Sequence, residues 1–338
     1  MSMKKPFSAF ALPALLLSAA WAAPAAAQPE TPRVPAIEQQ VTRLGQGSGG
    51  VVGVAAWRLD GKGPRVLVNA DQAFPMASTF KVAVAAKIFD RVDKGELRLE
   101  QMLDVPSDMI VPSEVIADRL IHPGISLSIY NLLELMLTQS DNTATDVLTK
   151  AAGGPAVVTA WLRGQGVTGQ RVDRDTAGLL REFYGVGPGP LGERFAAAAK
   201  TNPALLGKSS QPDAVFDEDP RDTSTPTAMA TLLTRIFSGK ALSAQSTKAL
   251  IGIMERCRTG GARLRGKLPP GTVVANKTGT IGGTVNDTGV ITLPGDAGQI
   301  AIAVYVKKSA APMADRERAI AEIARSVHDF YLFSAPAK

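Results

Sequence analysis

Short apolar runs of strand type occur near both ends of the chain, and helical spacing of apolar residues fills the middle. Runs rich in β-branched residues predict strands at 51–57, 65–68, 272–275, 287–293 and 299–306, the first two flanking a Gly61-Lys62-Gly63 turn. Helical spacing predicts helices at 36–44, 78–92, 129–138, 143–151 and 314–333. This order predicts an α+β fold in which the two ends build one sheet layer and the middle forms an inserted all-helical domain.

The domain boundaries follow from the same pattern. We expect the sheet domain to comprise 36–74 and 226–338, and the helical domain to comprise 75–225 with a long loop at 171–225. Within that loop, residues Arg181 to Pro220 begin with a cluster of glycines and prolines and end with an acidic cluster. They predict a long irregular excursion, and loops of this length are usually functional lids or disordered.

The N-terminus has the layout of an export signal. Lys4 and Lys5 precede an apolar stretch from Phe7 to Ala23, and three alanines at 25–27 provide a cleavage site. We therefore predict a signal peptide at 1–27, a disordered leader at 28–35, and a periplasmic or secreted product. An uncleaved membrane anchor is the alternative, but Pro13 and the alanine-rich end favour cleavage.

Composition excludes several classes of function. The 338-residue chain has 45% hydrophobic and 20% charged residues, and loss of Lys4 and Lys5 with the signal lowers its net charge from +6 to +4. Its basic residues are scattered, so no nucleic-acid partner is expected. Two histidines and one cysteine without metal-site spacing predict no metal, and no cofactor is expected. The glycine-rich runs at 45–50 and 261–267 lack the flanking elements or residues of nucleotide-binding loops.

Three motifs carry the candidate chemistry. They are Ser78-Thr79-Phe80-Lys81, Ser140-Asp141-Asn142 and Lys277-Thr278-Gly279, in this order along the chain. Each alone is common, and a serine that caps a helix beside a solvated lysine is the ordinary interpretation of the first. Together they supply a nucleophile, two proton carriers and an anion-binding group, as a serine acyl-transferring enzyme requires.

Ser78 and Lys81 lie one helical turn apart on the same face of the predicted helix. A serine hydroxyl needs a neighbouring base, and Lys81 can serve if burial, the helix dipole and the charge of Lys277 lower its pKa. Asp141 is expected to stabilise the turn between two helices through backbone hydrogen bonds.

With these three motifs, the chain resembles class A β-lactamases and penicillin-binding proteins from Ala36 to Phe333. The resemblance implies a β-lactamase/transpeptidase-like fold with an antiparallel sheet flanked by helices. It also implies catalytic roles for Ser78, Lys81, Ser140 and Lys277, with Ser140 passing a proton to the leaving nitrogen. The substrate would be bound by Asn142, Thr278, Gly279, Thr280 and Arg263, with an oxyanion hole formed by the backbone N–H groups of Ser78 and Thr280. The third motif is expected to end an edge strand beside the nucleophile.

The chain departs from the family at the loop that supports deacylation. Thr176 occupies the position of the family's glutamate and Leu180 that of its asparagine, so neither side chain can act as a base. Arg174 and Asp222 are expected to form the salt bridge that closes the neck of this loop. The replacement base is left open among five carboxylates: Asp175, Glu182, Asp217, Glu218 and Asp219.

Three functions remain open at this point. The first is a serine β-lactamase that hydrolyses β-lactams through a Ser78 acyl-enzyme. The second is a D-alanyl-D-alanine peptidase that acts on peptidoglycan stem peptides, and the third is a β-lactam-binding module without turnover. In each case the partner is a small molecule or stem peptide, and we expect a monomer without a stable membrane anchor.

Overall fold

The structure is a computed structural model that describes residues 1–2, 34–120 and 122–334. The predicted signal peptide, except its first two residues, and most of the predicted leader lie outside the described residues. The described residues from 34 to 334 belong to one compact unit. None of the helices in the described ranges combines the length and the apolar composition that a membrane span needs.

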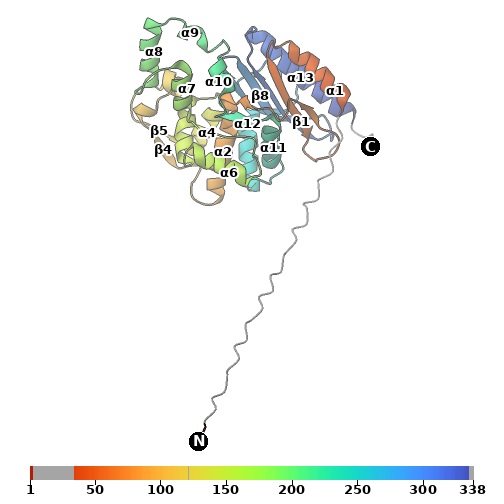
Figure 1. Cartoon of the computed structure of the whole chain (residues 1–338), viewed down its shortest axis with the longest axis horizontal. Helices are drawn as coiled ribbons and strands as arrows, with labels where there is room; N and C mark the ends of the chain where they lie inside the picture. Colours follow the sequence, from red (N-terminus) through yellow and green to blue (C-terminus); the bar gives the residue numbers. More distant parts are fainter. Residues whose placement is uncertain (3–33, 121, 335–338) are drawn as a thin grey trace. The chain divides into compact units, whose positions relative to one another are not determined.

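A five-stranded sheet forms the centre of this unit (Figure 1). Its strands are β1 (Val51–Arg58), β2 (Val66–Val68), β7 (Val274–Ile281), β8 (Thr284–Thr292) and β9 (Gln299–Lys307). They lie in the order β2-β1-β9-β8-β7, and every neighbouring pair is antiparallel. The predicted α+β fold with an antiparallel sheet is confirmed, and β7 is an edge strand of the sheet.

Two terminal helices cover one face of the sheet. They are α1 (Pro35–Gln46) and α13 (Met313–Phe333), which pack against each other and against the strands (Figure 1). Aliphatic side chains such as Val54, Ile302 and Ile323 form the apolar core between these layers. The expected helices at 36–44 and 314–333 are therefore correct to within two residues at each end.

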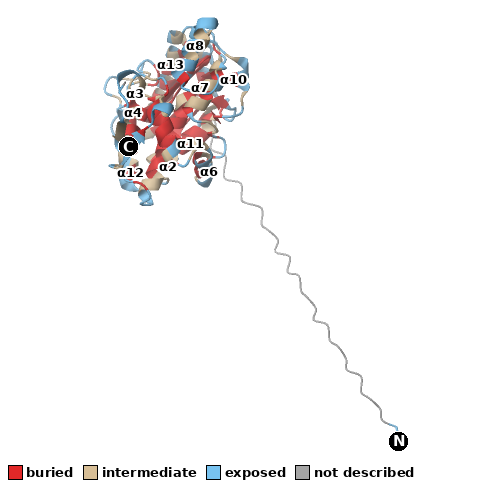
Figure 2. Ribbon diagram, turned by 90° about the vertical axis from the view of Figure 1, so that its left-hand side faces the viewer, coloured by how far each residue is buried: buried red, intermediate tan, exposed pale blue. Residues whose placement is uncertain are grey.

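The other face of the sheet is covered by α11 (Pro226–Phe237), beyond which the helical part of the chain packs. Its central helix, α2 (Lys81–Asp93), has side chains buried on nearly all sides (Figure 2). The helices around it are α4 (Ile129–Thr138), α5 (Asn142–Ala151), α6 (Pro155–Gly164) and α12 (Ala244–Glu255). All five strands of the sheet come from 36–74 and 226–338, while the division into two domains stays a prediction.

Short elements complete the described chain. The short helices are η1 (Ala77–Phe80), η2 (Ser107–Met109) and α3 (Ile116–Arg119). Two small antiparallel sheets pair β3 (Phe74–Pro75) with β6 (Thr223–Ser224) and β4 (Met102–Val105) with β5 (Ile125–Ser128). The predicted helix at 78–92 thus begins with one tighter turn, η1, before the regular helix starts at Lys81.

The expectation of an irregular excursion at 181–220 is wrong. This segment contains the end of α7 (Thr176–Tyr184) and all of α8 (Leu191–Thr201), α9 (Leu205–Lys208) and α10 (Ala214–Glu218). An alanine-rich stretch forms α8, whose residues are mostly exposed (Figure 2). Phe183 and Phe216 bury their rings together beside Ala77, so a small apolar core of its own stabilises the segment.

Candidate active site

The three motifs meet at one cavity of about 290 Å³. Its lining comprises Ser78, Ser113, Glu114, Gln139, Ser140, Asn142, Thr259, Arg263, Thr278, Gly279 and Thr280. Ser78 comes from η1, Ser140 from the turn between α4 and α5, and Gly279 from β7. Residues more than 130 positions apart in the sequence are therefore brought to one site.

Ser78 is held by a constrained turn next to β7. The preceding residue, Ala77, has a φ of +46°, and the amide of Asn286 donates hydrogen bonds to the carbonyl oxygens of Pro75 and Met76 at 2.9 and 3.1 Å. A Cβ at Gly279 would lie 2.5 Å from the Met76 carbonyl oxygen and 3.1 Å from the Ser78 nitrogen. Glycine is thus required for β7 to approach the nucleophile this closely.

The third motif forms the last part of the edge strand β7, as expected, but the strand predicted at 272–275 is longer and runs from Val274 to Ile281. β7 continues to Ile281 because Lys277 pairs with Thr288 and Thr280 pairs with Val285 in β8. The opposite edge of β7 has no neighbouring strand in the sheet. An extended substrate could therefore add to this edge through main-chain hydrogen bonds.

Lys81 is completely buried below Ser78. Its ammonium nitrogen donates to the carbonyl oxygen of Ser140 at 2.6 Å, to the Ser140 Oγ at 3.2 Å and to the Asn142 Oδ1 at 2.9 Å. Burial, followed by the charge of Lys277, holds the pKa of Lys81 well below its usual value. The lowered pKa makes loss of the ammonium proton easier, and the neutral amine that results can accept a proton.

Ser140 joins the two lysines. Its Oγ accepts hydrogen bonds from Lys81 Nζ and from Lys277 Nζ, the latter at 3.0 Å. A hydroxyl oxygen has two lone pairs, so its own proton remains available for donation into the cavity. The backbone at Ser140 has a φ of +60°, and Asp141 stabilises this turn by accepting from Ala144 N at 2.8 Å and Ile116 N at 2.9 Å.

Lys277 and Thr278 supply the polar groups on the β7 side. Burial lowers the pKa of Lys277 to about 8, while the nearby Cys257 and Asp287 oppose the shift. The Thr278 Oγ1 lies 2.6 Å from the Thr259 Oγ1, which fixes its position at the cavity wall. A cation and a hydroxyl on adjacent residues can together bind a carboxylate.

Arg263 lines the cavity, but its guanidinium is already committed to other groups. It is 6% exposed, pairs with Glu317 at 3.0 Å and donates to the carbonyl oxygens of Gly279 and Asn286 and to the Thr280 Oγ1. Arg263 therefore stabilises β7 through its hydrogen bonds to Gly279 and Thr280.

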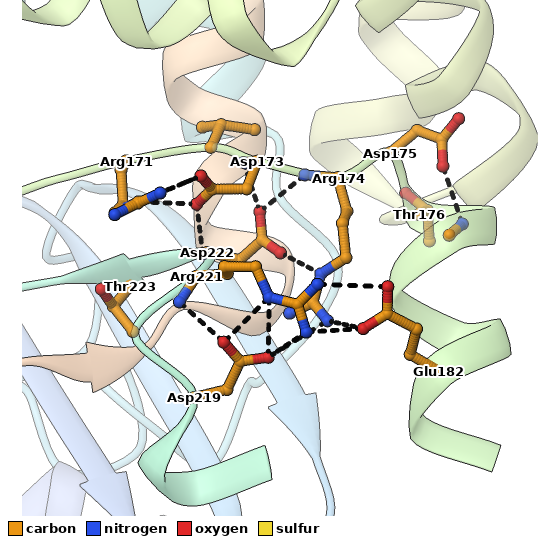
Figure 3. Close-up of polar contacts among 12 residues, drawn as sticks. Arg171, Asp173, Arg174, Asp175, Thr176, Glu182, Asp219, Arg221, Asp222 and Thr223 are labelled. Atoms are coloured by element: carbon orange, nitrogen blue, oxygen red, sulfur yellow. Dashed lines mark hydrogen bonds and ion pairs between the residues drawn. The ribbon is translucent and has the colours of Figure 1, made fainter. Parts of the chain in front are cut away.

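The neck of the loop is closed by a dense ionic network (Figure 3). Arg174 Nε lies 2.6 Å from Asp222 Oδ2, and the same carboxylate accepts from the backbone nitrogens of Asp173 and Arg174. Arg174 also contacts Glu182 at 2.7 Å and Asp219 at 3.2 Å. The sequence-predicted partners of the neck are thus in direct contact.

The five carboxylates considered as deacylation bases do not line the cavity at Ser78. Asp175 accepts from the Gly178 nitrogen at 2.7 Å and so caps α7, with its carboxylate directed toward that helix in Figure 3. Glu182 and Asp219 pair with Arg221, and Glu218 pairs with Lys308. Glu114, which sequence reasoning did not single out, is the acidic side chain at the rim among the described lining residues.

Sequence reasoning also missed Asp146, which lies one helical turn after Asn142 on α5. This residue is 3% exposed and accepts from the backbone nitrogens of Thr176 at 2.7 Å and Ala177 at 2.8 Å. Burial, and then the neighbouring Asp175 carboxylate, raises the pKa of Asp146 to about 6. The spacing of four residues from Asn142 was the only signal in the sequence.

No group of three or more histidine, cysteine, aspartate and glutamate side chains is placed to hold a metal ion within the part of the chain that the structure describes. The arrangement offers nucleophilic acyl transfer by a serine, with two lysines and a second serine as proton carriers and anion-binding groups.

Comparison with known proteins gives a consistent result. A model of the β-lactamase enzyme family matches residues 36–331. The extended-spectrum β-lactamase PER-1 of Pseudomonas aeruginosa is 29% identical over 306 residues, which cover 88% of each chain. Two solved structures cover 87% of this chain and 99% of their own: an ancestral class A β-lactamase with 34% identity and a TM-score of 0.72, and a β-lactamase from Chitinophaga pinensis with 32% identity and a TM-score of 0.71.

Proposed function

The chain belongs to the β-lactamase enzyme family, and from this premise we propose that Ser78 opens the β-lactam ring to form an acyl-enzyme that water then hydrolyses. One observation supports the catalytic roles of Lys81, Ser140 and Lys277. Ser140 Oγ accepts from both Lys81 and Lys277 in the cavity that Ser78 lines. This geometry supplies a base for the nucleophile and a donor for the leaving nitrogen at the same time.

Acylation follows from these contacts. Ser78 Oγ attacks the lactam carbonyl carbon while its proton passes to the neutral amine of Lys81. The negative charge on the carbonyl oxygen is stabilised by the backbone N–H groups of Ser78 and Thr280, a type of contact worth about 3 to 4 kcal/mol per donor. As the C–N bond breaks, the nitrogen takes the proton of the Ser140 hydroxyl, which Lys81 replaces.

The charged groups around the cavity orient the substrate. Lys277 and Thr278 bind the carboxylate that β-lactams carry next to the ring nitrogen, and the Asn142 amide contacts the side-chain amide. Arg263 holds β7 in place through Gly279 and Thr280 and adds positive potential behind the carboxylate. No cofactor takes part in this scheme. The enzyme would act in the periplasm or outside the cell after its signal peptide is cleaved.

A D-alanyl-D-alanine peptidase is the alternative that one observation favours, because Thr176 and Leu180 replace the groups that speed deacylation in class A enzymes. Intact mass of the protein, followed over time after a penicillin is added, separates the two. Hydrolysis predicts an adduct that returns rapidly to the free mass, whereas the peptidase predicts a persistent adduct and release of D-alanine from a stem peptide.

The Ser78→Ala variant provides the control for this measurement. It should fold normally, because Ser78 is only half-buried and lies in a short turn, and it should form no adduct. Labelling that persists in this variant would contradict the assignment of the nucleophile.

A further inference from the structure

The deacylation half of the reaction needs a base, and a hydroxyl stands where the family has a carboxylate. Thr176 is 6% exposed at the start of α7, and its Oγ1 is buried without a hydrogen-bond partner of good geometry. Buried hydroxyls rarely lack a partner, so one that does is a candidate for a functional role. The threonine at position 176 is therefore relevant to the deacylation step.

Asp146 lies directly beside this hydroxyl. Its two carboxylate oxygens accept from the Thr176 and Ala177 nitrogens, which leaves further lone pairs free on each oxygen. The Thr176 side chain is also close enough to lower the pKa of this carboxyl, although burial keeps that pKa at about 6. Asp146 is thus ionised at neutral pH and faces a hydroxyl that can pass it a proton.

Neither residue lines the cavity at Ser78, but the immediate neighbours of the pair connect it to the nucleophile and to Lys81. Leu179, one turn after Thr176, packs in the same apolar cluster as Ala77, the residue before Ser78. On α5, the charge of Asp146 raises the pKa of Lys81, in opposition to burial, and Asn142, one turn earlier, accepts a hydrogen bond from Lys81 Nζ. Thr176 and Asp146 are therefore coupled, through residues one turn away, to the turn before Ser78 and to Lys81.

We propose that Thr176 and Asp146 act together as the deacylation base, the hydroxyl as the catalytic group and the carboxylate as the acceptor behind it. The inference rests on the proposed acyl-enzyme mechanism. A water attacks the acyl carbonyl carbon and gives its proton to Thr176 Oγ, while the Thr176 proton moves to Asp146. When the bond from the carbonyl carbon to Ser78 Oγ breaks, the proton returns through Thr176 to Ser78, and the product leaves as a carboxylic acid.

The pair also accounts for the missing family residues. Thr176 carries no carboxylate, but Asp146 on α5 supplies one that binds the backbone nitrogens of Thr176 and Ala177. The charged groups that face Asp146 are Lys81 on α2 and Asp175 ahead of α7. Lys81 favours the ionised form of Asp146 and Asp175 opposes it.

The decisive variant is Thr176→Val, which keeps the β-branched shape and both backbone hydrogen bonds to Asp146 but removes the hydroxyl. After a penicillin pulse, the decay of the adduct is followed by intact mass. Labelling at the wild-type rate with decay slowed on the order of 10²-fold is expected, because base catalysis is worth about 10²- to 10⁴-fold. Decay at the wild-type rate would overturn the inference and leave the proposed function intact.

The pH profile of decay distinguishes a chemical role of Asp146 from anchoring of α7. In the wild type the decay rate should fall as the pH drops below about 6, where Asp146 becomes protonated. Asp146→Asn should remove this acidic limb, and Asp175→Asn, which retains the helix cap, should shift the limb to lower pH. An acidic limb unchanged in Asp146→Asn would overturn the role of the carboxylate.

The same data separate this inference from the proposed function. A wild-type protein that is never labelled on Ser78, or whose adduct never decays, would overturn both the hydrolytic function and the relay. Rapid decay in the wild type and in Thr176→Val alike would overturn the relay alone.

Discussion

Arg174 Nε lies 2.6 Å from Asp222 Oδ2, with side chains that are only 9% and 5% exposed. This contact closes the neck of a segment of almost fifty residues that begins beside the active site and returns to β6. Because Asp222 also accepts from two backbone nitrogens, the ion pair fixes the backbone at both ends of the neck. Two helices of the segment, α7 and α10, pack against Ala77 and β7 through Phe183 and Phe216.

Loss of this pair should loosen the segment. Arg174→Ala leaves a buried carboxylate without its cation, which typically costs about 3 to 5 kcal/mol. The variant should unfold at lower denaturant concentration and be cleaved faster by protease within residues 185–220. Arg171→Ala is the matched control, because Arg171 pairs with Asp173 at the same neck but is largely exposed. Equal protease resistance in both variants would show that the pair does not stabilise the segment.

Gly279 should be intolerant of any side chain. Gly279→Ala would place a methyl group 2.5 Å from the Met76 carbonyl oxygen, so β7 or the Ser78 turn must shift. We expect a stability loss of about 1 to 3 kcal/mol from overpacking. We also expect acylation to slow by about 10²- to 10³-fold if one oxyanion donor is misplaced.

The control for this change is Gly261→Ala in the loop that leads to Arg263. A Cβ at Gly261 meets no atom within 4 Å, and its backbone is not in the positive-φ region. The second-order rate of acylation by a penicillin, together with the unfolding midpoint, checks both variants. Similar acylation rates in the two alanine variants would contradict the importance of the close approach.

The residues of the three motifs were predictable from the sequence, whereas the buried residues that contact and position them were not. Ser78, Ser140 and Thr278 belong to motifs whose spacing indicates their chemistry, and the structure places them in one cavity. Asp146 carries no motif, and its importance depends on Thr176, thirty residues away along the chain. Such a tertiary contact has no periodic signal in a single sequence.

The helices of the segment after α7 were missed for a local reason. The glycines and prolines between Gly185 and Pro190 indicate a turn, and they obscured the alanine-rich run that forms α8. The strand predicted at 272–275 was too short for a similar reason, since Lys277, Thr278 and Gly279 are not typical strand residues. Pairing with β8 overrides that preference and extends β7 to Ile281.

The pH dependence of substrate binding should report on Lys277. Burial lowers the pKa of Lys277 to about 8, so the side chain is cationic below that pH and neutral above it. A carboxylate ligand is bound by the cation, and kcat/KM should therefore fall as the pH rises through about 8. In Lys277→Arg, whose guanidinium stays charged, the alkaline limb should move to higher pH. A limb at about 8 in both proteins would assign it to another group.

Replacement of Thr176 by glutamate tests the loop directly. Thr176→Glu restores a carboxylate at the position where class A enzymes carry one, but this carboxylate would lie beside the buried Asp146. Two carboxylates in contact titrate as a pair, and one of them is protonated until the pH rises well above its ordinary pKa. Leu180 also supplies no amide to orient the water. We therefore expect the adduct of Thr176→Glu to decay up to about 10²-fold faster than that of the wild type at pH 8, with a much smaller gain at pH 6.

Thr176→Gln has the same size without a base, so its adduct should decay more slowly than that of the wild type at both pH values. Equal decay rates in the glutamate and glutamine variants would mean that a side chain at 176 does not reach the hydrolytic water, and the proton acceptor would then have to be sought at Lys81.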